Sequence, residues 1–94
     1  MEPLLVDGAP CRVLALTLPA GSRLLLIQAP RGVLACGYVS PAVAEKFGEA
    51  LATVTGVKTP DDMLAAAVTA VTPAASALGV RPGMTGRQAL SLLR

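Results

Sequence analysis

Two neighbouring segments of this chain are apolar on both sides, and this pattern constrains the fold more than any other feature. Segment 23–29 contains Leu24-Leu25-Leu26-Ile27, and segment 33–39 begins Val33-Leu34-Ala35. Side chains alternate between the two faces of a strand, so strands of this kind belong to a sheet that is covered on both faces. The helices of a 94-residue chain cover one face well. We therefore expect a partner subunit on the other face, which predicts a homo-oligomer.

The composition supports the same interpretation. Hydrophobic residues make up 53% of the chain and aromatic residues only 2%, so Leu, Val and Ala must build the core. A chain this short leaves a large share of its surface exposed, and so much apolar material favours burial against a second copy. The length indicates one domain that spans residues 1–94.

Short turns separate the apolar segments of the N-terminal half, and the first turn is Asp7-Gly8. The expected strands are residues 3–6, 9–18, 23–29 and 33–39. Because each strand is joined to the next by a few residues, the sheet is expected to be mostly antiparallel. Residues 66–71, rich in small and β-branched side chains, add a fifth strand. The sequence therefore predicts an α+β fold with four or five strands and helices packed on one face.

Helix starts recur in one style along the rest of the chain. Ser40, Thr59 and Thr72 each precede a proline, which pairs an N-cap hydroxyl with proline at the first helical position. Thr85 and Gln88 have the spacing of a capping box. The expected helices are residues 41–54, 59–64, 73–78 and 86–93. The predicted buried stripe of the first helix consists of Val43, Phe47, Ala50, Leu51 and Val54.

The composition excludes several kinds of chemistry. The chain has no histidine, which excludes Ser-His-Asp and Cys-His catalysis within one subunit. Its two cysteines, Cys11 and Cys36, are far apart, so the sequence predicts no metal site. The eight basic residues are scattered singly, and only Tyr38 and Phe47 are aromatic. This distribution predicts no nucleic-acid binding.

Three features of the sequence bear on the cellular location of the protein. The longest aliphatic run, Leu24–Ile27, is far shorter than the roughly 20 residues of a membrane-spanning helix. The N-terminus carries Glu2 and Asp7 and lacks the basic start of a signal peptide. Two cysteines without an export signal are typical of reduced thiols. We therefore expect a cytoplasmic protein that makes no membrane contact.

The first candidate site surrounds Cys36. The segment Cys36-Gly37-Tyr38 ends an apolar strand, and Ser40 begins a helix directly after it. Free N–H groups at the start of a helix bind anions and can lower the pKa of a thiol. We interpret Cys36 as a candidate nucleophile, and Gly37, Tyr38 and Ser40 as candidate contacts to a small anionic ligand. The alternative is a packed strand with a buried thiol and an ordinary helix cap.

Thr85 and Arg87 form the second candidate group. They lie in the segment Gly83–Arg87, where two glycines flank Thr85 at an expected helix start. Arginine in the first turn of a helix opposes the helix dipole, which indicates a specific partner such as a carboxylate or phosphate of a ligand. The alternative is an ion pair between Arg87 and a carboxylate such as Asp61 or Glu49.

Six short motifs, spread over nearly the whole chain, occur in a characteristic order. They are Leu24–Ile27, Cys36–Tyr38, Ala44–Lys46, Gly56–Thr59, Leu78-Gly79 and Gly83–Leu90. In this order and spacing they resemble the YunC-like proteins, small bacterial and archaeal proteins classed as a domain of unknown function. The resemblance implies a compact α+β domain in the cytosol. It implies no activity, cofactor or catalytic residue.

For function, the sequence supports two classes and a third alternative. The first is a non-catalytic small-ligand-binding or assembly domain, with its site at the Ser40 helix start and Arg87 completing it. The second is a small enzyme that uses Cys36 as a nucleophile, with Tyr38, Lys58 or a carboxylate assisting. The third is a structural partner of another protein. The sequence identifies no particular ligand or cofactor.

Overall fold

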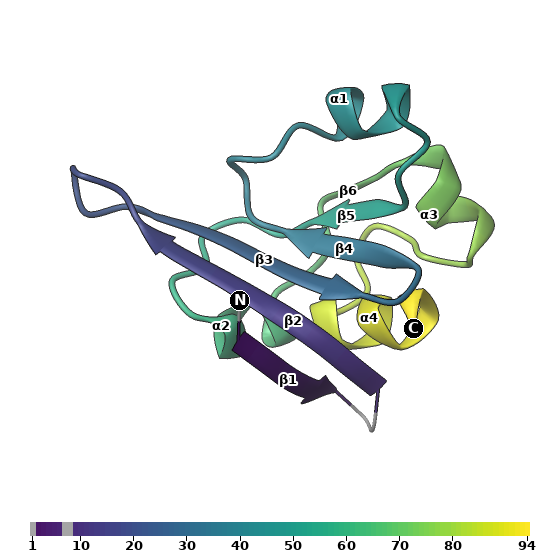
Figure 1. The fold of residues 1–94 in the computed structure, drawn as a ribbon. Coiled ribbons are helices and arrows are strands. Elements are labelled where there is room, and N and C mark those ends of the chain that lie inside the picture. Colours follow the sequence, from purple (N-terminus) through teal and green to yellow (C-terminus); the bar gives the residue numbers. More distant parts are fainter. Residues whose placement is uncertain (1, 7–8) are drawn as a thin grey trace.

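The structure, a computed structural model, describes residues 2–6 and 9–94, so the expected Asp7-Gly8 turn lies outside the described residues. Within them, six strands form one sheet whose order in space follows the order in the chain (Figure 1). The strands are β1 (Glu2–Val6), β2 (Ala9–Thr17), β3 (Arg23–Ala29), β4 (Gly32–Ala35), β5 (Leu51–Thr53) and β6 (Ala70–Val71). The helices are α1 (Pro41–Lys46), α2 (Pro60–Ala65), α3 (Pro73–Ala77) and α4 (Gly86–Leu93).

The sheet is mostly antiparallel. Strands β1 to β4 form a meander in which each neighbouring pair is antiparallel. Strand β5 pairs in parallel with β4 and antiparallel with β6. A parallel neighbour requires a crossover connection, which α1 and its flanking loops supply. The predicted α+β class and mostly antiparallel sheet are confirmed. Strand β6 lies within the expected strand 66–71, and the additional strand is the three-residue β5, in a segment expected to be helical.

The larger core cluster lies on the sheet face that α2, α3 and α4 cover. Leu25 and Ile27 of β3 and Leu34 of β4 are fully buried in it. The helices contribute Met63, Ala75, Ala89, Leu90 and Leu93. Aliphatic side chains therefore fill this core, as the near absence of aromatic residues requires.

Helix α1 packs on the opposite face. Its Ala44 forms a small cluster with Ala35 and Leu51, whose chain neighbours Leu34 and Ala52 belong to the larger core. Because side chains alternate along a strand, α1 lies across the sheet from the other helices. Figure 1 shows it beside β5, away from β1 and β2.

The expected helix over residues 41–54 is wrong in its second half. Helix α1 ends at Lys46, Gly48 adopts a left-handed φ of 72°, and the chain continues into β5. Val43 and Phe47 of the predicted buried stripe are 52% and 77% exposed. The other three stripe residues are buried, but they lie in and beside a strand. A short apolar run satisfies helical and strand spacing alike, so periodicity alone did not separate the two.

Gly86 and Arg31 fix the position of α4. A Cβ atom at Gly86, the first residue of α4, would overlap the carbonyl oxygen of Met63, so the absence of a side chain lets α4 approach α2 closely. At the other end, the Arg31 main-chain N–H donates to the Leu93 carbonyl oxygen at 2.7 Å. The Arg31 guanidinium donates to the Leu92 and Arg94 carbonyl oxygens. The turn between β3 and β4 thus satisfies carbonyl groups at the end of the helix.

Candidate functional site

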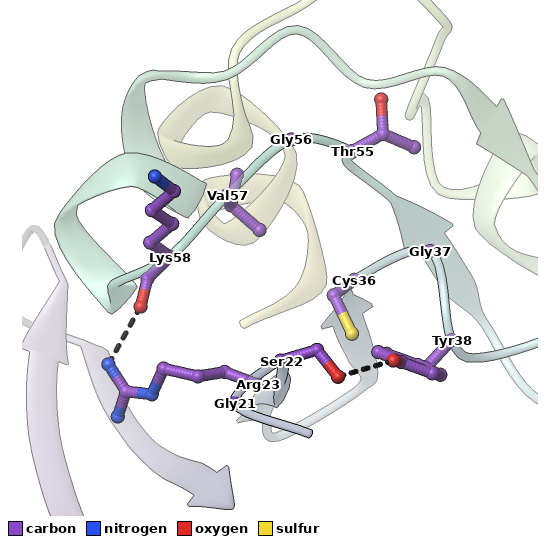
Figure 2. A pocket seen from close by; sticks show the side chains of 10 residues that line it. All are labelled: Gly21, Ser22, Arg23, Cys36, Gly37, Tyr38, Thr55, Gly56, Val57 and Lys58. Atoms are coloured by element: carbon purple, nitrogen blue, oxygen red, sulfur yellow. Dashed lines mark hydrogen bonds between the residues drawn. The ribbon is translucent and has the colours of Figure 1, made fainter. Parts of the chain in front are cut away.

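A pocket of about 640 Å³ opens where the turn between β2 and β3 meets the end of β4 (Figure 2). This volume is in the usual range of small-molecule sites in proteins. Three segments of the chain form its walls: 21–23, 36–38 and 55–58. The residues that line it are Gly21, Ser22, Arg23, Cys36, Gly37, Tyr38, Thr55, Gly56, Val57 and Lys58.

Cys36 is held at the pocket by strand β3. Its main-chain N–H donates to the Leu25 carbonyl oxygen at 3.0 Å, and the Leu25 N–H donates to Cys36 Sγ at 3.3 Å. The residue is 4% exposed, and its sulfur is directed toward the space between Ser22 and Tyr38 in Figure 2. The thiol is therefore nearly buried but faces the cavity.

Arg23 begins β3 at a position that normally faces the core. It shares a face of the strand with Leu25, Ile27 and Ala29, all of which are buried. Its Nη1 donates to the Lys58 carbonyl oxygen at 2.7 Å. Its Nε is buried and has no acceptor among the described residues. A buried donor without an acceptor costs about 1–3 kcal/mol, so this side chain is incompletely satisfied.

Two hydroxyl groups form the rim of the pocket opposite the loop 55–58. Ser22 Oγ and Tyr38 Oη are 2.6 Å apart and share a hydrogen bond. This contact joins the turn between β2 and β3 to the segment that follows β4. Tyr38 remains 58% exposed, so its ring lies at the mouth of the pocket rather than in the core.

The loop 55–58 is positioned by the start of α2. The Lys58 N–H donates to Asp62 Oδ2 at 3.0 Å, and the Asp62 N–H donates to Thr59 Oγ1 at 3.1 Å. Gly56 adopts a left-handed φ of 70°, which allows the turn into this loop. In Figure 2 the Lys58 ammonium extends away from Cys36, so its carbonyl oxygen is the group closer to Arg23.

The pocket is positively charged. Arg23 and Lys58 are among its lining residues, and none of the ten lining residues carries a carboxylate. A concave surface lined by one sign of charge raises the local concentration of oppositely charged small molecules. The arrangement therefore suits an anionic molecule that also contacts the Cys36 sulfur.

The structure brings some of the sequence-predicted site residues together and leaves others apart. Cys36, Gly37 and Tyr38 line the pocket. Ser40 does not line it and caps α1, where its Oγ accepts from the Val43 N–H at 3.4 Å. The Ser40 cap and the pocket are therefore separate features of the fold.

Thr85 and Arg87 also lie outside the pocket. Thr85 caps α4, since its Oγ1 accepts from the Gln88 N–H at 3.2 Å and its own N–H donates to Gln88 Oε1 at 2.8 Å. The predicted capping box is thereby confirmed. Arg87 is exposed on the first turn of α4.

Arg23 is the pocket residue that sequence reasoning missed. The available signal was a single arginine in phase with the buried aliphatic residues of its own strand. Ser22 and Thr55 were also missed, because neither belongs to a motif and both join the site only through the fold.

Residues 2–6 and 9–94 lack two further kinds of feature. No group of three His, Cys, Asp or Glu side chains in these ranges is arranged to hold a metal ion. None of the helices described there combines the length and the apolar character needed to cross a bilayer.

Comparison with known proteins identifies the family. The family described as "Domain of unknown function (DUF1805)" matches residues 35–93. The uncharacterized protein YunC of Bacillus subtilis (strain 168) is 32% identical over 94 residues, which cover 96% of this chain and 92% of that protein. The chain belongs to the DUF1805 family. The resemblance to YunC-like proteins inferred from the motifs is confirmed.

A solved structure shares the fold of this chain. The crystal structure of a protein of unknown function, TA1206 from Thermoplasma acidophilum, aligns with a TM-score of 0.93 and 30% sequence identity. The alignment covers 99% of this chain and 90% of that one. The fold is therefore one already observed in a similar protein.

Proposed function

We propose that this protein is a non-catalytic domain that binds a small anionic molecule in the pocket beside Cys36. The observation that carries the proposal is the pocket itself, about 640 Å³ in volume and lined by two cations, hydroxyl groups and one thiol. Gly37 and Tyr38 contribute to its wall. Ligand sites of this kind combine an apolar cavity with a few convergent polar groups.

Binding without catalysis is favoured because the chain has no histidine. No other side chain has an ordinary pKa that allows easy proton transfer near neutral pH. The Lys58 ammonium, the obvious substitute, extends away from the Cys36 sulfur (Figure 2).

The alternative is a small enzyme that uses Cys36 as its nucleophile. The observation that favours it is the orientation of the sulfur, which faces the cavity and accepts a hydrogen bond from the Leu25 N–H. Such an enzyme would carry its substrate on Cys36 as a covalent intermediate.

We also propose that the protein acts as a homo-oligomer in the cytoplasm. On the sheet face that carries α1, strands β1 and β2 have no helix of the described residues packed over them. This open part of the face supports assembly, because Leu5 of β1 and Leu16 of β2 are 73% and 50% exposed. The two free cysteines support a reducing compartment. A different protein seated on the same face would make this chain a structural partner, and the mass of the purified protein in solution would separate the two possibilities.

Native mass spectrometry of gently purified protein, followed by thermal unfolding with small carboxylates and phosphates, tests the binding proposal. A ligand at 100 times its Kd stabilises the fold by about 2.7 kcal/mol. In a domain of this size, that free energy raises the Tm by roughly 10–20 °C. An extra mass that survives denaturation on Cys36 would instead favour the enzyme.

Thr55→Trp is a variant designed to fill the pocket, because Thr55 is exposed and lines it. We expect it to abolish ligand-induced stabilisation, whereas Ala42→Trp, on the exposed side of α1, leaves the stabilisation unchanged. The proposal fails if no anion stabilises the protein, or if both variants respond as the unmodified chain does.

A further inference from the structure

We infer that the ligand carries a carboxylate or phosphate group, and that the Nε–Nη2 edge of Arg23 holds this group in the pocket that Cys36 also lines. The inference rests on the proposed function and goes further, since it names the anchoring residue and the chemical class that the residue recognises.

The position of Arg23 is the first step. On the same face of β3, Leu25 and Ile27 are fully buried and Ala29 nearly so. An aliphatic side chain at position 23 would continue this apolar row without a charge to desolvate. Residues that break the local pattern of a fold concentrate at functional sites. Arg23 breaks it where the core opens into the pocket.

The geometry of the guanidinium is the second step. Its Nη1 is occupied by the Lys58 carbonyl oxygen at 2.7 Å. The opposite edge, formed by Nε and Nη2, is the one whose two N–H groups point in the same direction and match the paired oxygens of a carboxylate or phosphate. On this edge Nε has no acceptor among the described residues.

An anion reaches this edge of Arg23 after a movement of the guanidinium. Because Nε is buried, the guanidinium has to turn toward the cavity and release the Lys58 carbonyl oxygen. Two hydrogen bonds between the guanidinium and the anion, which join opposite charges, then replace one hydrogen bond to an uncharged carbonyl oxygen. The exchange favours the bound state and leaves Nε satisfied.

The strand that carries Arg23 also determines where the rest of the ligand lies. Leu25, two residues beyond Arg23 on the same strand, exchanges hydrogen bonds with the main chain and sulfur of Cys36. The anchor and the thiol therefore belong to one rigid part of the sheet and line one cavity. A small molecule that is bound by its anionic group on Arg23 presents its remaining atoms to Cys36 Sγ.

Alkylation of Cys36 by two reagents of nearly equal size tests the inference. In both reactions the sulfur forms a bond to the CH₂ carbon, iodide leaves with the electron pair, and the thiol proton passes to solvent. Iodoacetate carries a carboxylate and iodoacetamide does not. Peptide mass spectrometry assigns the product to Cys36, so that any reaction of Cys11 is counted separately.

We expect the iodoacetate-to-iodoacetamide rate ratio of the folded protein to exceed that of the urea-unfolded chain by about fivefold or more, because a nearby cation favours the charged reagent. Arg23→Gln should return the ratio to the unfolded value, and Arg23→Lys, which keeps the charge but loses the paired donors, should lower it. Arg12→Gln is the matched control, because Arg12 is exposed and lies in register with Gln28 on the opposite face.

The outcomes separate this inference from the proposed function. If iodoacetamide modifies Cys36 only after unfolding, the pocket admits no small molecule and both fail. If iodoacetamide reacts with the folded protein but the ratio matches that of the unfolded chain, only the assignment of Arg23 fails. Slower alkylation in acetate supports a carboxylate ligand, and slower alkylation in inorganic phosphate at equal ionic strength supports a phosphate. Protection by neither anion overturns the inference, and circular dichroism checks that each variant is folded.

Discussion

The two cysteines are both buried in the larger core cluster, and Cys36 also lines the pocket. Cys11 lies in the larger core cluster on β2, where burial raises the pKa of its thiol above the ordinary value of 9.0. Cys36 lies at the wall of the pocket and accepts a main-chain hydrogen bond. Cys11 therefore behaves as a small hydrophobic residue, and Cys36 is the thiol that a ligand can meet.

The raised pKa of Cys11 predicts a loss of stability at high pH. Above pH 9.0 the thiol ionises in the unfolded chain while it stays protonated in the folded chain, so the unfolded state is favoured until the folded pKa is also passed. Below pH 9.0 both states hold the proton and Cys11 makes no pH-dependent contribution. Urea unfolding of Cys11→Ala and of the unmodified chain, each measured between pH 8 and about pH 10.5, isolates this effect.

We expect the unmodified chain to lose stability faster than Cys11→Ala across this range, although the variant starts from a lower value because it leaves a small cavity. Parallel pH profiles for the two proteins would contradict the assignment of a buried, protonated Cys11.

Among the residues that line the pocket, those predicted from the sequence as candidate site residues are continuous in the chain. Cys36, Gly37 and Tyr38 are consecutive, and all three line the pocket. Arg23 was missed because its significance depends on which face of β3 points to the core. The apolar run that follows Arg23 leaves this phase open, since both faces of the strand are apolar.

Among the secondary-structure elements, the helix starts follow most directly from local sequence. Ser40, Thr59 and Thr72 each accept a hydrogen bond from the N–H group three residues later, as their Ser/Thr-Pro pattern predicts. The parallel pairing of β5 with β4 could not be predicted in this way. It depends on contacts between distant residues, whereas a cap depends on its own turn.

Thr72 does more than cap α3, and this predicts an unequal cost of substitution. Its buried Oγ1 accepts from the Leu51 N–H at 3.0 Å and donates to the Glu49 carbonyl oxygen at 2.8 Å, besides accepting from the Ala75 N–H at 3.3 Å. We expect Thr72→Val to lower the free energy of unfolding by about 2–4 kcal/mol, because it leaves buried main-chain groups of β5 and α3 without partners.

Thr59→Val is the matched control for this measurement. Thr59 is exposed and caps α2 through the Asp62 N–H, so its loss should cost about 1 kcal/mol. Urea unfolding followed by circular dichroism measures both values. Equal losses in the two variants would show that the contacts of Thr72 with the β5 region add nothing.

On the scale of the whole molecule, the two faces of the sheet are covered unequally. In the part of the chain that the structure describes, three helices cover one face, and α1 alone packs on the other, over β4 and β5. The continuous apolar pattern of the central strands required cover on both faces, and this requirement followed from the sequence. A helix that begins at residue 41 was predicted, but its place was not, because all helices were expected on one face of the sheet and α1 packs on the other.

The open part of this face predicts association of subunits. We expect size-exclusion chromatography with light scattering to give a mass above that of one 9.5 kDa chain at micromolar concentration. Leu16→Lys, which introduces a charge on the open face, should reduce the mass to that of a monomer. Ala65→Lys, at an exposed position of α2, should leave it unchanged. A monomeric mass for the unmodified chain would refute the homo-oligomer.

The contact between Arg31 and the end of α4 has a consequence for biosynthesis. The carbonyl oxygens of Leu92, Leu93 and Arg94 accept hydrogen bonds from Arg31, and Leu90 and Leu93 complete the larger core. The ribosome delivers β1 to β4 first, and α2 and α3 follow, but the cover on the apolar face of these strands stays incomplete until residues 86–94 have been synthesised. Folding to the final packed state is therefore expected to follow translation of this segment, and a nascent chain stalled before α4 would expose the sheet to chaperones and proteases.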